Sequence, residues 1–554
     1  KKGVQRCKMN IFDVIKKKIF AKLGIVKENA LQNDSDRLTF INNEKAIVRQ
    51  RLKEYTTWYY GNADELLNYY TGVNLIRANV EPLYYRNQRG YFWATSSTES
   101  DIKRTHSGQP RNIVDTLVSI TSFPLIESGN ILDDESVVNQ NLQKIIKESG
   151  LEDIYMNEQM PMTLVEGWGC YKINWNKEIS DYPYAVFYRA EDVDFIKSGG
   201  RIIGVIFRDY YTNGKKKYCL IETRSMKYDS EKDERSLVIE KELYEMISDE
   251  KGKKITNFGA VPELADVEKY IEIGPVNLLF AVPTVFFKNT SNVGEYGRSI
   301  FTGKIELFDD LDQALSQGAN AVRRSTPIEY FDSEFLERDR KTGIPMKPKS
   351  FDRKYAIYKG TRNADGGTDS GPVTVTQPNV DFSIYSNEAV AILLQIMNGL
   401  MSPATIGIDV AKKDNAEAQR EKEKMTVFTR TNLAKKETNI LKNLCSQLLV
   451  AYEFMTTGKI TVEEYDISVK YSEFADDSYE NKIEKLGNAY DSELISDEMY
   501  MDKLYGNSLS RAEYKKELNW LKENHTKPKI DGLKGIAGGG VNLPGMFNDD
   551  DEDI

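Results

Sequence analysis

The sequence is poor in the side chains that most often carry out chemistry. Among 554 residues there are two histidines, His106 and His525, and four cysteines. The cysteines are too widely spaced for a CxxC metal pair or a disulfide framework, which is typical of a reducing compartment. They are Cys7, Cys170, Cys219 and Cys445. A His-based metal centre or a Ser-His-Asp triad would need one of the histidines, and both lie in polar, loop-like sequence. We therefore expect no enzyme activity, no metal and no cofactor.

Long hydrophobic runs and an excess of positive charge are also missing. The longest apolar stretches, 273–287 and 389–401, are interrupted by proline or polar residues and fall short of the roughly 20 residues that cross a bilayer. The N-terminus does not have the pattern of a secretory signal. Lys and Arg total 75 against 85 Asp and Glu, which gives a net charge of −10 and argues against a free-standing basic nucleic-acid binder. A hydrophobic share of 40% excludes a wholly disordered chain.

No glycine-rich phosphate-binding loop is found. The stretch 166–170 lacks the third glycine of a dinucleotide fingerprint and precedes strand-like sequence, so it predicts a tight turn. The stretch 294–303 is not followed by Gly-Lys-Ser/Thr.

The two ends of the chain differ from the rest in composition. Residues 1–24 carry eight basic groups and one acidic group, a balance of +7, and their apolar residues predict an amphipathic helix over 10–23. Such a helix could bind a partner protein or a lipid surface. From 526 the chain is rich in glycine and ends in the acidic run Asp549–Asp553, a composition that predicts disorder.

The first half of the chain changes from helical to strand-like periodicity. Apolar residues recur at helical spacing over 45–72, 107–125 and 136–160. From Tyr171 the period becomes two and predicts an antiparallel β region, with hairpin turns at Gly199-Gly200 and Asn213-Gly214. The charged stretches 227–236 and 247–255 are expected to be solvent-exposed loops.

The second half is mainly helical. A helix is expected from 297 to about Pro327, followed by a small turn-rich α/β insertion over 326–385 and a return helix over 386–402. Next come a loop at 403–415 and a stretch without Gly or Pro over 416–455, about 60 Å long if fully helical. A short strand at 467–471 and a helical segment at 477–523 complete the pattern. The fold class is therefore α+β, mainly α.

Two charged clusters have alternative interpretations. Asp309, Asp310 and Asp312 form a DDxD pattern that could bind Mg²⁺ in a nuclease or hydrolase, although a solvated helix face is the simpler expectation. Lys412 and Lys413 lie in the loop at 403–415 and would by themselves be solvated. Repeated once per subunit in a symmetric ring, they could contact a phosphate backbone that no single copy could hold.

Six stretches, in this order and spacing, resemble the portal protein of tailed bacteriophages, in the form common among long-tailed phages of Gram-positive hosts. The resemblance covers roughly residues 45–525. The stretches are Trp58–Asp64, Ser107–Leu117, Tyr218–Arg224, Gly297–Phe301 leading to Asp309–Ser316, Ser402–Asp409 leading to Asn415–Ala418, and Asp491–Glu517. The N-terminal extension 1–44 and the tail 526–554 lie outside it.

The resemblance implies the portal fold, assembled as a ring that is usually of twelve subunits. Its parts would be a wing at 45–296 with the strand region 459–472 returning to it, stem helices at 297–325 and 386–402, a clip at 326–385, a tunnel loop at 403–415, a long helix at 416–458 and a crown at 477–525. Double-stranded DNA would pass through the central channel during packaging and ejection. Twelve chains at −10 would carry about −120, which suits a conduit along which DNA slides.

The resemblance also implies partners and site residues. The ring would occupy one capsid vertex of the virion, would form in the host cytoplasm without stable membrane insertion, and would meet the terminase large subunit, a head–tail adaptor, and major capsid and scaffolding proteins. The expected sites are subunit contacts on the stem (Leu311, Leu315, Leu393, Ile396), the outward-facing clip (Phe335, Arg338, Lys347, Arg353) and the tunnel loop (Thr405, Ile406, Asp409, Lys412, Lys413, Asn415). The alternatives are a metal-dependent nuclease or hydrolase that uses Asp309, Asp310 and Asp312, and a scaffold or peripheral membrane protein that acts through 10–23.

Overall fold

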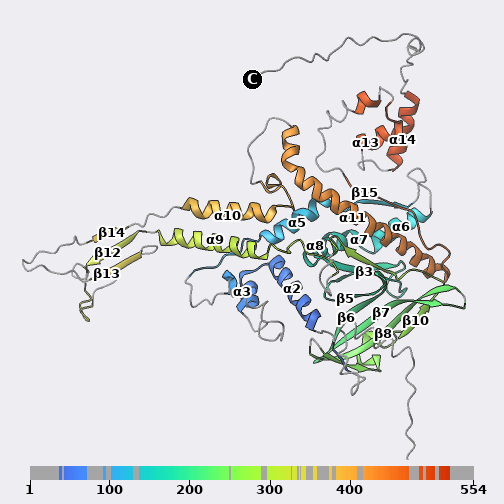
Figure 1. Cartoon of the computed structure of the whole chain (residues 1–554), viewed down its shortest axis with the longest axis horizontal. Coiled ribbons are helices and arrows are strands. Elements are labelled where there is room, and N and C mark those ends of the chain that lie inside the picture. Colours follow the sequence, from blue (N-terminus) through green and yellow to red (C-terminus); the bar gives the residue numbers. More distant parts are fainter. Residues whose placement is uncertain are drawn as a thin grey trace, which may run out of the picture. The chain divides into compact units, whose positions relative to one another are not determined.

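A computed structural model describes most of the chain (Figure 1). The described residues are 37–39, 43–71, 91–94, 102–128, 137–231, 233–248, 251–288, 296–325, 327–332, 336, 338–344, 354–358, 373–376, 382–407, 416–472, 486–490, 494–505 and 511–524. The chain divides into two compact units, residues 1–471 and 472–554, and each is described by itself. The predicted helix 10–23, His525 and the tail 526–554 lie outside the described residues.

The helices expected in the first 166 residues are confirmed. They are α2 Asn43–Tyr60, α3 Ala63–Thr71, α5 Gln109–Thr121, α6 Val137–Glu148, α7 Leu151–Ile154, the π-helical turn η4 Tyr155–Gln159 and α8 Met160–Glu166, together with the 3₁₀ turn η3 Phe92–Ala94. Pro110 lies in the first turn of α5, where a missing N–H costs no helical hydrogen bond. Gly167 ends α8 with a φ of 95°, a conformation that glycine adopts readily, so the predicted tight turn is confirmed at Gly167, while Trp168–Cys170 already belongs to a strand.

Two antiparallel sheets form the β region. The larger has the order β1-β9-β8-β7-β6-β5, with β10 also paired to β8, and the smaller has the order β11-β3-β4. The strands are β1 Arg37–Thr39, β3 Trp168–Asn174, β4 Tyr184–Arg189, β5 Val193–Ser198, β6 Arg201–Asn213, β7 Lys216–Asp229, β8 Glu234–Ser248, β9 Lys251–Ile255, β10 Tyr270–Ile273 and β11 Ala281–Val285. The hairpin turns at Gly199-Gly200 and Asn213-Gly214 are confirmed.

Two loop predictions in this region are wrong. The strands β7 and β8 extend to within a few residues of each other, so most of 227–236 is strand. The segment 251–255 is the strand β9, which pairs with β8 and with β1. Both segments are charged because they lie where the sheet is exposed, and backbone pairing rather than apolar burial holds them in place.

A buried charge network joins the two sheets. Arg224 of β7 donates hydrogen bonds from Nη1 to the carbonyl oxygens of Ile173 (2.9 Å) and Phe280 (2.5 Å) and from Nε to the carboxylate of Glu222 (2.8 Å). Lys172 of β3 lies 3.1 Å from the same carboxylate. Burial acts to raise the pKa of Glu222, but Arg224 and Lys172 together bring it down to about 2, so the group is ionised at neutral pH.

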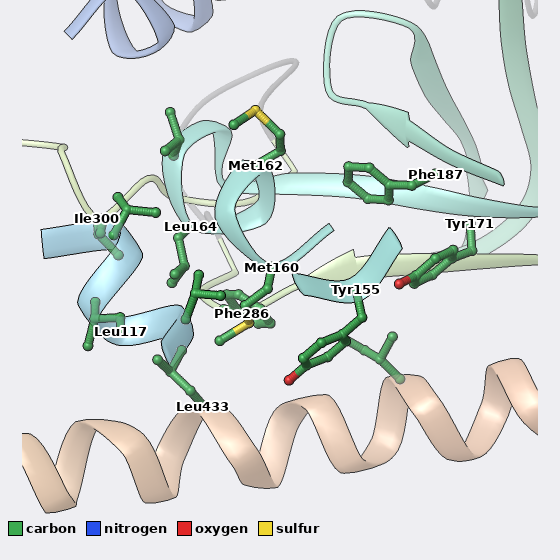
Figure 2. Close-up of a cluster of buried hydrophobic side chains, with 14 of the residues drawn as sticks. Leu117, Tyr155, Met160, Met162, Leu164, Tyr171, Phe187, Phe286, Ile300 and Leu433 are labelled. Carbon is green, nitrogen blue, oxygen red and sulfur yellow. The ribbon is translucent and has the colours of Figure 1, made fainter. Parts of the chain in front are cut away.

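The main hydrophobic core lies between the short helices, the smaller sheet and the long helix α11, Ala416–Thr457 (Figure 2). Leu433 of α11 faces Leu117 of α5, and the hydroxyl of Tyr155 points towards α11. The predicted long helix over 416–455 is confirmed. After it, the strand β15, Ile467–Lys470, pairs with β2, Leu125–Ser128, so the end of this unit is hydrogen-bonded to a segment near its beginning.

Two helices, α9 (Ile305–Arg324) and α10 (Phe382–Met397), lie side by side (Figure 1). Between them in the sequence lies a three-stranded sheet of β12 Ile328–Asp332, β13 Lys354–Tyr358 and β14 Val373–Thr376. The helix expected from 297 begins only at Ile305, because Ser299–Lys304 forms turns. In the predicted α/β insertion, the described residues before Phe382 contain strands but no helix.

The described part of the second unit is helical at 486–490, at α13 Asp497–Tyr505 and at α14 Arg511–Asn524, all within the predicted helical segment or one residue beyond it. The helices α13 and α14 contact each other, and the hydroxyl of Tyr514 donates to the carbonyl of Glu498 at 3.1 Å. Tyr490 stacks on Tyr500, with the ring centroids 4.4 Å apart. In neither unit is any described helix long and apolar enough to cross a bilayer.

Candidate functional site: the α9–α10 helix pair

The helices α9 and α10 run antiparallel and in close contact. At the start of α9, Lys304 Nζ donates to the carbonyl oxygens of Ile396 (2.7 Å) and Asn398 (3.0 Å), which lie at the end of α10. Further along, a Cβ added to Gly318 would lie 3.2 Å from the Cβ of Tyr385, near the start of α10. Glycine at 318 therefore allows the two helices to approach closely.

Asp309, in the first half of α9, binds backbone N–H groups of a distant segment. Its carboxylate accepts hydrogen bonds from the N–H of Phe92 (2.6 Å) and of Trp93 (3.2 Å) in η3. Its side chain is buried, and only 2% of the residue is exposed. Burial raises the pKa of Asp309 to about 7; the two N–H donors act against that rise, while Asp312 and Asp310 add to it.

Asp312, one turn further, holds three more groups of the same region. It accepts from Trp93 Nε1 (3.1 Å) and from the Ser107 N–H (2.8 Å), and its Oδ2 lies 2.6 Å from His106 Nδ1. Next on this face, Ser316 Oγ accepts from the N–H of Thr105 at 2.9 Å. Asp309, Asp312 and Ser316 thus fix α9 to residues 91–94 and 104–107.

The expectation that Asp309, Asp310 and Asp312 form a solvated face is wrong for two of the three. Asp309 and Asp312 are buried, with exposed fractions of 2% and 0%, and only Asp310 is exposed. The carboxylate oxygens of both buried residues already accept hydrogen bonds from protein donors. Among the described residues no group of three His, Cys, Asp or Glu side chains could hold a metal ion. His106 does lie in a loop, as expected, but its side chain is buried and pairs with Asp312.

An apolar groove lies along the second half of α9 and the first half of α10. Its cavity measures about 460 Å³. Large apolar side chains on its walls are exposed: Leu315 to 37%, Val322 to 55% and Val390 to 43%. Leu393 also lines the groove and is half-buried. These neighbouring exposed apolar side chains make the groove a candidate contact surface for a partner.

Two of the four predicted stem contacts need correction. Leu311 and Ile396 are buried inside their own chain, with exposed fractions of 2% and 0%, so they have almost no surface left for a neighbouring subunit. Both face the core that α9 and α10 share with the rest of the unit. Leu315 and Leu393 keep exposed surface in the groove, and their predicted contact with a subunit stays a prediction.

The loop that follows α10 is tied to α11 by one threonine. Thr426 is fully buried; its Oγ1 accepts from the N–H of Ser402 (2.8 Å) and lies 2.6 Å from Thr405 Oγ1. Ile406 ends the 3₁₀ turn η7, Pro403–Ile406, and is half-buried. Thr405 and Ile406, both predicted channel residues, are therefore partly packed against the chain's own body.

The other predicted site residues fall into two groups. Arg338 is described and exposed, before the strand β13. Seven residues lie outside the described part of the chain, and their predicted roles stay predictions: Phe335, Lys347, Arg353, Asp409, Lys412, Lys413 and Asn415.

Sequence patterns missed several residues that shape this region. Trp93 and Thr426 act through hydrogen bonds to residues far away in the sequence, and no local pattern marks them. Glu437 of α11 is fully buried and accepts from Gln159 Nε2 at 2.7 Å. Burial raises the pKa of Glu437 to about 8, with the Gln159 bond acting against that rise. The sequence does offer one indication that Glu437 is unusual, because this charged residue lies on the otherwise apolar helix face formed by Ile440, Leu444 and Leu448.

The comparisons with known proteins include a distant structural likeness. No protein-family model matches the sequence, and a search of curated proteins finds no match. Among solved structures, a chain from the virion of a native gene transfer agent particle aligns with a TM-score of 0.33 and 12% sequence identity. The alignment covers 74% of this chain and 89% of that chain. This chain is therefore distantly similar to a protein of a virus particle, at a TM-score too low to establish a shared fold.

Proposed function

We propose that the chain is a subunit of a ring-shaped portal at one vertex of a phage capsid, through which double-stranded DNA enters and leaves. The observation that carries the proposal is the apolar groove between α9 and α10. A monomer in water would leave Leu315, Val322 and Val390 partly exposed, and burying them against another copy would gain roughly 25 cal/mol for each Å² removed from water.

The order of the elements supports the same proposal. Two antiparallel helices enclose a small sheet in the sequence, and a loop then leads into the long helix α11. Near its start α11 carries a second exposed apolar group, Met425, Val427 and Phe428. Two apolar surfaces on different elements suit a head-to-tail interface, which closes into a ring when each copy is rotated by a fixed angle.

A conduit rather than an enzyme is also consistent with the acidic balance of −10 per chain, because a net negative channel wall lets DNA slide instead of gripping it. In this proposal Lys412 and Lys413 provide weak, sequence-independent contact. Replacing both by alanine should reduce the DNA packaging rate or DNA retention, and unchanged values would refute that contact.

The ring itself is tested by native mass spectrometry and negative-stain microscopy of the purified chain. The expected result is a closed ring of about twelve subunits with a central hole. The double variant Leu315→Asp/Val390→Asp should give monomers. The matched control Ile179→Asp changes an exposed apolar residue in the turn between β3 and β4 and should leave the ring intact. A wild-type chain that is monomeric at all concentrations and salt levels would refute the proposal.

A further inference from the structure

A second cavity, unrelated to the helix pair, lies between α2 and the neighbouring strands β6 and β7. It measures about 710 Å³, within the range of roughly 300–1,000 Å³ that is typical of small-molecule sites. Its walls are polar as well as apolar, in contrast to the groove between α9 and α10. Nothing in the proposed ring function uses it.

Positive charge is concentrated on its walls. Arg49, Lys53, Arg189 and Lys217 line the cavity, and Glu191 is the one acidic residue among its lining residues. Arg189 is engaged by its ion pair with the buried carboxylate of Glu166 and lies 3.8 Å from Glu191. In a chain with a net charge of −10, such a local excess of cations attracts anions.

Three of these cations are available to a ligand. Lys53 and Lys217 are exposed, and within the described part of the chain neither forms an ion pair. Arg49 is held in place by the hydrogen bond that its Nη2 donates to the Tyr210 hydroxyl at 3.3 Å. That bond orients the guanidinium and uses one of its five N–H donors.

Tyrosine rings stand beside these cations. Tyr60, at the end of α2, and Tyr210 of β6 both line the cavity and are about half exposed, at 52% and 47%. An exposed aromatic face next to cationic groups is the combination that holds a nucleotide, because the base stacks on the ring while the phosphates meet the cations.

We infer that this cavity binds a nucleotide, with its phosphate groups held by Arg49, Lys53 and Lys217 and its base stacked on Tyr60 or Tyr210. The shared chemistry is a phosphate joined to a flat base, and it could come from a free nucleotide or from a single strand of nucleic acid. Duplex DNA does not fit this chemistry, because its bases are already stacked and paired.

The test is calorimetric titration of the full-length protein at low salt with ADP, inorganic pyrophosphate and a twelve-residue oligothymidylate. ADP should bind saturably, one per chain, about tenfold or more tightly than pyrophosphate, because only ADP carries a base that can stack. If the oligonucleotide competes with ADP and binds more tightly, the natural ligand is a single strand. If it does not compete, the ligand is a free nucleotide.

Variants separate the two halves of the site. Lys53→Ala/Lys217→Ala should weaken ADP and pyrophosphate alike, by about tenfold or more, through lost charge-assisted hydrogen bonds. Tyr60→Leu should weaken ADP and leave pyrophosphate unchanged. The controls are Lys177→Ala and Tyr228→Leu, both exposed and outside the cavity, which should bind like the wild type.

Three results would overturn the inference. One is the absence of saturable binding by ADP and by the oligonucleotide. A second is wild-type affinity in the double lysine variant, with melting curves confirming that both proteins are folded. The third is equal affinity for ADP and pyrophosphate, which would leave no role for the base. None of these outcomes affects the ring proposal, because the oligomeric state is measured separately.

Discussion

The two halves of α9 differ in how completely the rest of the chain covers their side chains and supplies hydrogen-bond partners for them. In the first half, Asp309 and Asp312 are buried and bonded to N–H groups of residues 91–94 and 106–107. In the second half, Leu315 and Val322 are apolar and remain exposed in the groove beside α10. The first half of this helix is therefore packed and hydrogen-bonded within a single chain, whereas the second half leaves apolar surface uncovered.

This difference shows that polar residues can fix a helix while apolar residues on it remain uncovered. The usual arrangement places apolar side chains inside and carboxylates outside. The first half of α9 buries Phe308 and Leu311 as well as its two carboxylates, so the position of the helix depends on directional hydrogen bonds in addition to apolar burial, while apolar side chains of its second half stay uncovered.

The largest expected effect comes from removing the buried carboxylate of Asp312. Asp312→Ala leaves Trp93 Nε1, the Ser107 N–H and His106 Nδ1 without their acceptor, and should lower the free energy of unfolding by about 3–5 kcal/mol. Urea unfolding followed by tryptophan fluorescence measures it. Asp310→Ala, on the exposed side of the same turn, should change it by less than about 0.5 kcal/mol. Equal effects of the two substitutions would mean that the buried carboxylate of Asp312 stabilises the fold no more than the exposed carboxylate of Asp310.

The pH dependence of stability tests the first half in another way. Because the pKa of Asp309 is raised from 3.8 to about 7, the folded chain binds this proton more tightly than the unfolded chain does. Its contribution is complete below pH 4 and is lost as the pH rises towards 7, at up to about 1.4 kcal/mol per pH unit. Asp309→Asn should flatten this part of the profile relative to wild type. An unchanged slope would contradict the burial of this carboxyl group.

A smaller effect is expected where the loop after α10 meets α11. Thr426→Val keeps the shape of the side chain but removes the acceptor of the Ser402 N–H and the partner of Thr405. The free energy of unfolding should fall by about 1–2 kcal/mol, and proteolysis between residues 402 and 407 should become faster. The control Thr431→Val changes an exposed hydroxyl bonded only to its own helix, at the carbonyl of Val427, and should do neither.

The smallest effect on stability per substituted site is expected in the groove. Leu315→Ser/Val390→Ser removes side chains that are already partly in water, so the unfolding free energy of the dissociated chain should fall by only about 1 kcal/mol per site. A loss of several kcal/mol per site, measured by the same urea titration, would mean that the groove is already filled within one chain and that the two halves of α9 are alike.

Periodicity in the sequence predicts the type of element well in the interior of the unit. The alternation around Tyr171 and Ile173 identifies β3, although that strand is buried on both faces, Lys172 included, and the spacing of Ile440, Leu444 and Leu448 identifies the second half of α11. It fails for β9, Lys-Gly-Lys-Lys-Ile, because that strand is held by backbone hydrogen bonds to β8 and contributes little apolar surface.

The site was less predictable because its partners lie far away in the sequence. Asp309 and Trp93 are separated by 216 positions, and only the folded chain brings them together. Helical spacing correctly placed Leu311 and Leu315 on neighbouring parts of one face. It could not tell that the first is covered by its own chain while the second is exposed, since that depends on where α10 and the segment 104–107 pack.

The pairing of β15 with β2 affects how the chain folds as it is made. Ser128 Oγ donates to the carbonyl of Asp466, and these residues are 338 positions apart. At about 5–20 residues per second, a ribosome needs roughly 20–70 s to make the intervening chain. During that time β2 lacks this partner strand, and the exposed edge is open to pairing with other chains. Folding of the first unit therefore finishes late in synthesis, and chaperones that shield strand edges should raise the yield of soluble protein.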